Sequence, residues 1–260
     1  MKDVIVIKIG GSTFDSRDTT IEDVVSLQKQ GKSLVIVHGG ANVVTGWLKR
    51  LDISTRFVRG ERVTDAPTLE VVIAVLAGLV NKEIVAAINS LGGQAVGISG
   101  VDGALIQGKM KSMEMGYMGT VAKVNPASLE ALLSAGFLPV VSPLSLHSVD
   151  RPENTSQIIN VNGDPVAGEI AAALGAERLI FLTDVPGISN QSGEIISRLS
   201  DGEAEALIAS GVASGGMIPK INACLRTLTM GTLTRIIDGR KPHALIDELE
   251  GKDGGTTIYK

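Results

Sequence analysis

Short runs of β-branched and aliphatic residues alternate with longer segments of helical periodicity along most of the chain. Strands that are each followed by a helix pair in parallel, and a parallel sheet needs helices on both of its faces. The pattern therefore predicts an α/β protein with a mainly parallel central sheet. The predicted strands are 4–9, 33–37, 94–98, 138–142, 179–183 and 234–237, and the predicted helices are 20–30, 42–51, 67–91, 125–135, 164–174, 202–210 and 219–230.

Two segments depart from this alternation. Residues 104–124 consist of short extended pieces separated by glycines, which favours an antiparallel hairpin able to form a lid over a site. Residues 147–157 are polar and predict an irregular loop, and we expect the helix after it to lead into a second lobe. We place the boundary near residue 171, which gives an N-terminal lobe of residues 1–171 and a C-terminal lobe of residues 172–260.

The composition excludes several classes of protein. The chain has 260 residues, of which 44% are hydrophobic and 20% charged, as in compact folded proteins. It carries 24 Lys and Arg against 28 Asp and Glu, a net charge of -4, so it lacks the basic footprint of a nucleic-acid-binding protein. The aromatic residues (Trp 1, Tyr 2, Phe 4) are too few for stacking platforms. We expect no nucleic-acid partner.

The cysteine and histidine content and the apolar stretches indicate the compartment. A single cysteine, Cys224, allows no intramolecular disulfide and no cysteine-based zinc site, and the three histidines are scattered. The longest apolar stretch, residues 71–80, is half of the roughly 20 residues that a membrane span requires. The first residues lead directly into a strand without a readable export signal. We therefore expect a cytoplasmic protein with no membrane partner and no resident metal site.

Glycine pairs follow the first two predicted strands, as Gly10-Gly11 and Gly39-Gly40. The chain contains neither G-x-x-x-x-G-K-[ST] nor G-x-G-x-x-G, so the P-loop and the common dinucleotide fingerprint are both absent. Adjacent glycines at one sheet edge can turn sharply and present backbone N–H groups to an anion. The alternative is that each pair is only a tight strand exit.

Two lysines are candidate partners of a phosphate. Lys8 lies inside the apolar first strand, where a lysine is rarely buried without a counter-charge, although a structural lysine on an edge strand remains an alternative. Lys220 follows Pro219, which suits the first turn of a helix. Taken alone, Lys220 is equally consistent with a solvated helix lysine, because a cation gains nothing from a helix N-terminus.

Several short motifs follow one another along nearly the whole chain. They are residues 8–11 (KIGG), 38–40 (HGG), 61–64 (ERVT), 79–83 (LVNKE), 100–103 (GVDG), 159–164 (INVNGD), 182–187 (LTDVPG) and 214–220 (SGGMIPK). In this order the motifs resemble those of the amino-acid kinases, most strongly of the branch that phosphorylates N-acetyl-L-glutamate in arginine biosynthesis. The resemblance implies a three-layer α/β/α sandwich, with the acyl amino acid bound by the N-terminal lobe and MgATP by the C-terminal lobe.

The resemblance implies a role for particular residues. Lys8 and Lys220 would stabilise the transition state, and Asp164 would orient both lysines. Without the family, Arg62 would form a surface ion pair with Glu61, and Asn160 or Asn162 would be a turn residue that caps the next helix. The resemblance assigns Gly10 and Gly11 to the transferring phosphate, Gly40, Ala41, Arg62 and Asn160 to the acyl amino acid, and Asp184, Val185, Pro186, Gly187, Ile188, Ser189, Val212, Ala213, Ser214 and Met217 to the nucleotide.

The implied reaction requires few catalytic groups from the protein. A γ-carboxylate with a pKa near 4.3 is already ionised at neutral pH, so no general base is needed. Positioning and charge neutralisation remain, and lysines at two ends of a crevice offset the charge of in-line phosphoryl transfer. We expect the phosphates of ATP to hold Mg²⁺, because the candidate loops offer few carboxylates.

Two features leave the acceptor open. The second loop reads HGGA where the family usually has a third glycine, and the loop at 145–157 is longer than usual. One alternative is therefore a kinase of an aminoadipate or glutamate linked to a carrier protein, which should show basic residues at the substrate mouth. Lys109 and Lys111 are the modest cluster available, and we interpret both as solvated. A second alternative is a non-catalytic nucleotide-binding regulator, against which Lys8, Asp164 and Lys220 argue.

The resemblance also bears on assembly. The chain begins at the first strand, without the additional N-terminal helix of the arginine-inhibited hexameric members. We expect a homodimer insensitive to arginine, although residues 236–240 and 242–245 resemble the arginine-sensitive branch.

Overall fold

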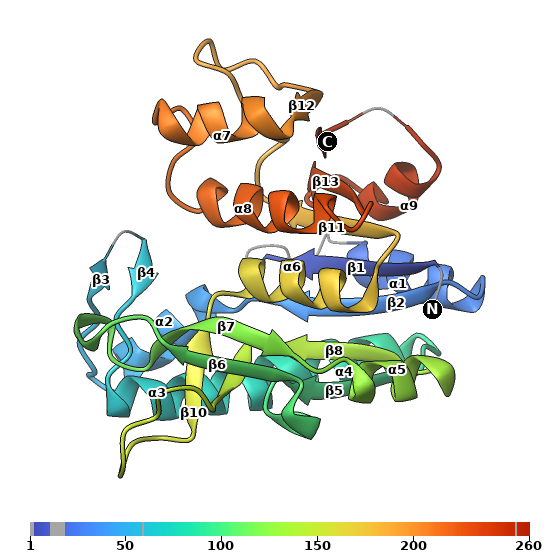
Figure 1. The fold of residues 1–260 in the computed structure, drawn as a ribbon. Helices are drawn as coiled ribbons and strands as arrows, with labels where there is room; N and C mark the ends of the chain where they lie inside the picture. Colours follow the sequence, from blue (N-terminus) through green and yellow to red (C-terminus); the bar gives the residue numbers. More distant parts are fainter. Residues whose placement is uncertain (1–2, 11–18, 59, 253) are drawn as a thin grey trace.

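A central eight-stranded sheet organises the chain in the computed structural model, which describes residues 3–10, 19–58, 60–252 and 254–260 (Figure 1). The strand order is β12-β14-β13-β11-β1-β2-β8-β5, and all neighbours are parallel except β13 and β14. The strands are β1 (Val4–Ile9), β2 (Ser33–His38), β5 (Ala95–Ser99), β8 (Leu138–Ser142), β11 (Arg178–Thr183), β12 (Arg198–Ser200), β13 (Leu233–Asp238) and β14 (Thr256–Tyr259).

Helices cover both faces of this sheet, which confirms the predicted three-layer α/β/α sandwich. Side chains of α5, α6, α7 and α8 pack in one core cluster, and those of α1, α2, α3, α4 and α9 in the other. The helices are α1 (Thr20–Lys29), α2 (Ala41–Arg50), α3 (Ala66–Ile73), α4 (Asn81–Ser90), α5 (Ala127–Ser134), α6 (Gly163–Leu174), α7 (Asp201–Ala209), α8 (Met217–Leu228) and α9 (Ala244–Leu249), with the π-helical turn η1 (Ala74–Val80) and the short 3-10 turns η2 (Asp102–Ala104) and η3 (Met113–Met115).

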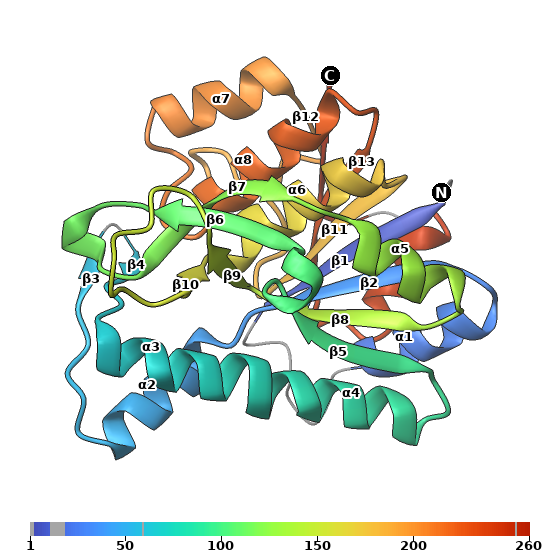
Figure 2. The ribbon, with the colours of Figure 1, turned by 60° about the horizontal axis from the view of Figure 1, so that its bottom comes forward.

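The predicted strands and helices are confirmed within two residues at each end. Local capping explains several boundaries. The Asp65 side chain accepts a hydrogen bond from the Thr68 amide at the start of α3, and Ser200 and Glu203 form a capping box at the start of α7. The single long helix predicted at 67–91 is continuous through α3, η1 and α4 (Figure 2).

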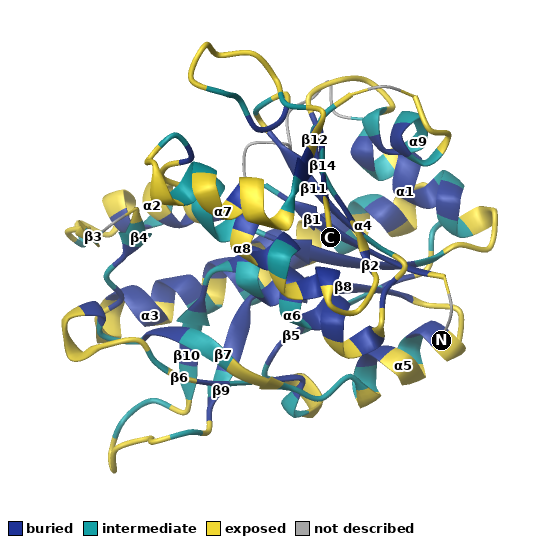
Figure 3. Ribbon diagram, turned by 45° about the horizontal axis from the view of Figure 1, so that its top comes forward, coloured by how far each residue is buried: buried dark blue, intermediate teal, exposed yellow. Residues whose placement is uncertain are grey.

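That long helical segment, Ala66–Ser90, is the one in the described part of the chain with the length and composition that could cross a membrane. It packs against β5 and β8, and residues such as Val72, Ile84 and Ile88 belong to the core. The burial pattern in Figure 3 shows buried and exposed faces on these helices, as expected of a helix that covers a sheet.

The hairpin predicted at 104–124 is confirmed as the antiparallel pair β6 (Ile106–Met110) and β7 (Met118–Val124). The prediction missed its partners, because β9 (Leu144–His147) and β10 (Ile158–Val161) join the pair in a closed four-stranded barrel. A separate two-stranded hairpin, β3 (Phe57–Val58) and β4 (Glu61–Arg62), was also missed. The irregular loop after His147 is confirmed up to β10.

The C-terminal elements form the upper part of Figure 1, and the barrel with α3 and β5 forms the lower part. The predicted lobe boundary near residue 171 falls inside α6, which packs against β1 and α8. The division into lobes of residues 1–171 and 172–260 stays a prediction.

Candidate active site

Strand parity determines the direction of Lys8. Successive side chains of a strand point to opposite faces of the sheet. In β1, Val4 and Val6 belong to the core cluster beneath α6 and α8, whereas Ile5 and Ile7 belong to the opposite cluster. Lys8 shares the parity of Val4 and Val6. Its ammonium therefore faces the layer of α6 and α8.

Lys8, Asp164 and Lys220 meet in this layer. The Nζ atom of Lys8 lies 2.7 Å from Oδ1 of Asp164, and the Nζ atom of Lys220 lies 3.0 Å from Oδ2. The side chains of both lysines are largely buried, with 9% and 14% of their surface exposed. One carboxylate thus pairs with two ammonium groups from different elements, an arrangement that the family resemblance implies.

The electrostatics of Asp164 follow from this geometry. Burial alone would raise the pKa of Asp164, but the attraction of Lys8 and Lys220 outweighs it and leaves the pKa below its ordinary value. The carboxylate is therefore charged at neutral pH. Since two cations surround one anion, the array carries a net positive charge, suited to a further anionic group.

Asp164 lies in the first turn of α6, which places its carboxylate between the ammonium groups of Lys8 and Lys220. The Asn162 side chain caps the helix by accepting a hydrogen bond from the Asp164 amide at 3.0 Å. Gly163 lies next to the Lys8 side chain, where a Cβ would make an ordinary van der Waals contact with Cε of Lys8 at 3.6 Å. The predicted capping role of Asn162 is confirmed.

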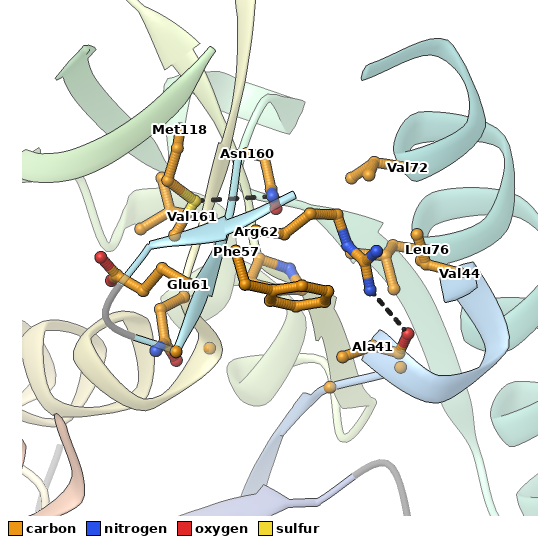
Figure 4. A pocket seen from close by; sticks show the side chains of 16 residues that line it. Ala41, Val44, Phe57, Glu61, Arg62, Val72, Leu76, Met118, Asn160 and Val161 are labelled. Carbon is orange, nitrogen blue, oxygen red and sulfur yellow. Dashed lines mark hydrogen bonds between the residues drawn. The ribbon is translucent and has the colours of Figure 1, made fainter. Parts of the chain in front are cut away.

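Figure 4 shows a cavity of about 160 Å³. Its lining includes Asn162 and Gly163, which directly precede Asp164 in the chain. The cavity brings together all four residues predicted to hold the acyl amino acid. Its lining residues are Gly39, Gly40, Ala41, Val44, Phe57, Gly60, Glu61, Arg62, Val72, Leu76, Met118, Pro143, Asn160, Val161, Asn162 and Gly163.

Arg62 is buried in this cavity, with 7% of its surface exposed. Its Nη2 donates to the carbonyl of Ala41 at 3.1 Å and to Oγ1 of Thr45 at 2.7 Å, and the guanidinium stacks 4.8 Å above the centre of the Phe57 ring. Its Nη1 is buried without a hydrogen-bond partner. Burial lowers the pKa of Arg62, which still remains charged. An unpartnered guanidinium nitrogen in a cavity fits a carboxylate ligand.

Asn160 lies across the cavity on β10. Its Nδ2 donates to Oγ1 of Thr64 at 3.2 Å and contacts the sulfur of Met118 at 3.5 Å. Sequence reasoning missed Phe57, Thr45 and Leu76, because the apolar patterns that contain them are equally typical of core residues. The sequence carried no local signal for Phe57, because the two-residue strands that place it opposite Arg62 are too short to predict.

Three alternative interpretations of the sequence are wrong. Lys8 is not on an edge strand, because β1 lies between β11 and β2. Lys220 is not solvated, because it pairs with Asp164. Arg62 is not paired with Glu61, because Glu61 forms an ion pair with Lys111 instead. The interpretation of Lys109 and Lys111 as solvated charges is confirmed, because both are exposed, and Lys111 forms a surface ion pair with Glu61.

Gly10 and the Gly39-Gly40 pair lie at the same end of the sheet, because Ile9 and His38 are register partners on parallel strands. The Gly10 amide donates to the carbonyl of Leu182 at 3.2 Å, which fixes this turn against β11. Gly11 lies outside the described residues. Gly40 has a φ of 149°, a backbone conformation that favours glycine, and Ala41 begins α2.

The residues predicted to hold the nucleotide occupy two loops. Asp184–Ser189 follow β11, and Val212–Ser214 precede α8, which begins at Met217. Pro186 lines a cavity of about 630 Å³ beside β13 and β14. The Ile188 and Ala213 side chains are buried in the core. The Ile188 amide donates to Oγ1 of Thr256 at 2.8 Å, and the Ala213 amide donates to the carbonyl of Leu207 at 2.9 Å. Their nucleotide role stays a prediction.

No cluster of three or more His, Cys, Asp or Glu side chains that could hold a metal occurs among residues 3–10, 19–58, 60–252 and 254–260. Asp164, the carboxylate nearest the lysines, is engaged by both of them.

The fold and this array define the class. The chain belongs to the amino acid kinase family, which it matches over residues 3–238. It is 52% identical over 255 residues to acetylglutamate kinase from Dehalococcoides mccartyi (strain CBDB1), covering 98% of this chain and 94% of the relative. It is 47% identical over 253 residues to acetylglutamate kinase from Nostoc sp. (strain PCC 7120), covering 94% of this chain and 83% of the relative.

Solved structures show the same fold. The smu.665 protein from Streptococcus mutans UA159 superposes with a TM-score of 0.83 at 26% identity, covering 100% of this chain and 99% of that chain. The N-acetylglutamate synthase from Neisseria gonorrhoeae, solved with coenzyme A and N-acetyl-glutamate, gives a TM-score of 0.84 at 26% identity and covers 99% of this chain but 59% of that one.

Proposed function

We propose that the chain transfers the γ-phosphoryl group of ATP to the γ-carboxylate of N-acetyl-L-glutamate, a step of arginine biosynthesis. The observation that carries the proposal is the Lys8–Asp164–Lys220 array beside a cavity that contains Arg62 and Asn160. The relatives named acetylglutamate kinase, about half identical over nearly the full chain, support this choice of substrate.

Each residue of the site has a separate role in the proposed reaction. Arg62 would hold the α-carboxylate, Asn160 the acetamido group, and the backbone of Gly40 and Ala41 the remaining polar atoms. The γ-carboxylate attacks as an anion, so no base is required. Lys8 and Lys220 would offset the charge that spreads over the transferring phosphoryl group, and Asp164 would keep both ammonium groups in place.

Mg²⁺ enters this proposal with the nucleotide. When bound, the ion would neutralise charge on the β- and γ-phosphates. The protein would contribute the ammonium groups of Lys8 and Lys220, which would offset charge on the same phosphates. The loops at 184–189 and 212–214 with Met217 would hold the nucleotide, as the family resemblance implies.

A coupled assay of ADP release tests the proposal. N-acetylglutamate, glutamate, aspartate, carbamate and N-acetylaminoadipate are each offered as acceptor, and hydroxylamine traps any acyl phosphate. Hydroxamate formation with N-acetylglutamate supports the assignment. Turnover with an alcohol acceptor would contradict the reasoning that no base is needed, and no acceptor-dependent ADP release would favour the regulator alternative.

The carrier-linked alternative requires a basic mouth that meets an acidic carrier protein. Lys111 is paired with Glu61 at the edge of the cavity, which reduces the charge available for such a partner. The cavity of about 160 Å³ also suits a small acyl amino acid. These observations favour free N-acetylglutamate.

We propose a cytoplasmic homodimer as the form of the enzyme. Sedimentation tests the dimer, and ADP release with and without arginine tests the insensitivity to arginine. We expect a dimer whose activity does not respond to arginine.

A further inference from the structure

His38 is the last residue of β2 and immediately precedes the Gly39-Gly40 turn of the cavity. It is fully buried. It shares its parity with Leu34 and Ile36, so its ring points to the sheet face opposite Lys8, beneath α4. The proposed reaction assigns no role to this side chain.

Both ring nitrogens of His38 have partners. The Nδ1 atom lies 2.7 Å from the carbonyl oxygen of Gly39, and the Nε2 atom lies 3.2 Å from Nδ2 of Asn81. A carbonyl can only accept, so Nδ1 must carry the hydrogen. The Nε2 atom is then the acceptor of a hydrogen bond from Asn81.

The orientation of Asn81 is fixed independently of His38. Its Nδ2 donates to the carbonyl of Val140 at 2.9 Å and lies 3.4 Å from that of Ile98, while its Oδ1 accepts from Nζ of Lys82 at 3.0 Å. Rotating the amide would place oxygen against two carbonyls. Asn81 therefore holds His38 in one tautomer.

The surrounding chain is shaped to allow this contact. A Cβ at Gly97 would lie 2.0 Å from Oδ1 of Asn81, so β5 carries glycine where the amide passes. The π-helical turn η1 precedes Asn81, and its Leu76 and Val80 pack against Gly40, where a Cβ would come within 2.7 Å of Leu76. The Gly39-Gly40 turn is thus held by His38 and by η1 together.

We propose that His38 is a positioning residue, which fixes the Gly39 carbonyl and so directs the backbone of Gly40 and Ala41 toward the acceptor, with Asn81 selecting its tautomer. The inference rests on the proposed function. Burial lowers the pKa of His38 to about 4, an effect to which Lys8 and Lys82 add, so the ring is neutral at neutral pH.

Two variants each keep one of the two hydrogen bonds of His38 and remove the other. In His38→Asn the side-chain amide nitrogen can replace Nδ1 and keep the bond to Gly39. In His38→Gln the amide oxygen can replace Nε2 and keep the bond to Asn81. We expect His38→Gln to lower kcat/KM for the acyl amino acid by about tenfold or more, the effect of one lost hydrogen bond, with KM for ATP within about twofold. His38→Asn should remain within about threefold of the wild type.

The control is His243→Asn, which removes an exposed histidine at a left-handed position that asparagine tolerates and should leave both constants unchanged. The proposal is overturned if His38→Asn and His38→Gln lose kcat/KM for the acyl amino acid to the same extent. It is also overturned if KM for ATP rises as much as kcat/KM for the acyl amino acid falls. Either result would mean that His38 serves only in packing.

Nitrogen NMR of the wild-type imidazoles gives a readout that does not depend on turnover or on a variant that folds. With three histidines in the chain, His38 is assignable. We expect protonated Nδ1 and unprotonated Nε2 from pH 6 to 8, and the opposite tautomer would refute the proposal. A wild type that phosphorylates no acyl amino acid would instead refute the proposed function, whatever the tautomer.

Discussion

Asp164→Asn is the most informative single substitution. The carboxylate is buried and lies 2.7 Å from the Lys8 ammonium and 3.0 Å from that of Lys220. The amide keeps the shape of the side chain but leaves two largely buried cations without a counter-charge. Removing one partner of a buried ion pair costs about 3–5 kcal/mol. For a chain of this size the melting temperature should fall by roughly 10 °C.

The kinetic effect should accompany this loss. Asparagine cannot hold both ammonium groups at the transferring phosphoryl group, so we expect kcat to fall on the order of 10²-fold or more. ATP should stabilise Asp164→Asn more than it stabilises the wild type, because its phosphates supply the missing negative charge. Thermal unfolding with and without nucleotide, together with ADP release, measures both effects.

A matched control lies on the same two helices. Glu169 on α6 pairs with Arg226 on α8 at 2.9 Å, but this pair is largely exposed. Glu169→Gln should therefore change the free energy of unfolding by less than about 1 kcal/mol and leave kcat unchanged. If Asp164→Asn behaves like Glu169→Gln, or gains less from ATP than the wild type, the electrostatic reasoning is wrong.

Three further predictions concern the same site. Lys8→Gln and Lys220→Gln should each lower kcat by about 10²-fold with little change in KM for the acceptor, as measured by ADP release; a selective rise in KM would contradict a transition-state role. Arg62→Lys should raise KM for the acyl amino acid by about tenfold in the same assay, because lysine cannot replace a guanidinium fork. His38 has a pKa of about 4 when folded against an ordinary 6.5, so its protonation favours the unfolded chain. The free energy of unfolding should be highest above pH 6.5 and fall toward pH 4 by about 3 kcal/mol from this residue, and urea denaturation should show a correspondingly smaller fall for His38→Asn.

The sequence predicted the elements whose signals are local. Strands β1 and β8 match their predicted bounds, and the long helix from Ala66 to Ser90 follows from its own apolar periodicity. Strands β3, β4, β9 and β10 were missed because each has two to four residues, too few for a period to appear. Their strand character comes from pairing with distant partners, such as β10 with β7.

The candidate site likewise has features that the sequence predicts and features that depend on the tertiary structure. The sequence by itself determined which residue types were available: a lysine in an apolar strand, glycines at two strand exits, and an asparagine that caps the helix of Asp164. Only the tertiary structure decided that Lys8 faces α6 and that Lys220 reaches the carboxylate of Asp164. It also decided that Arg62 lines the cavity and forms no ion pair with Glu61. The physical reason is that burial, and the pairing of buried charges that it requires, depends on how the layers pack, and sequence separation carries no record of that packing.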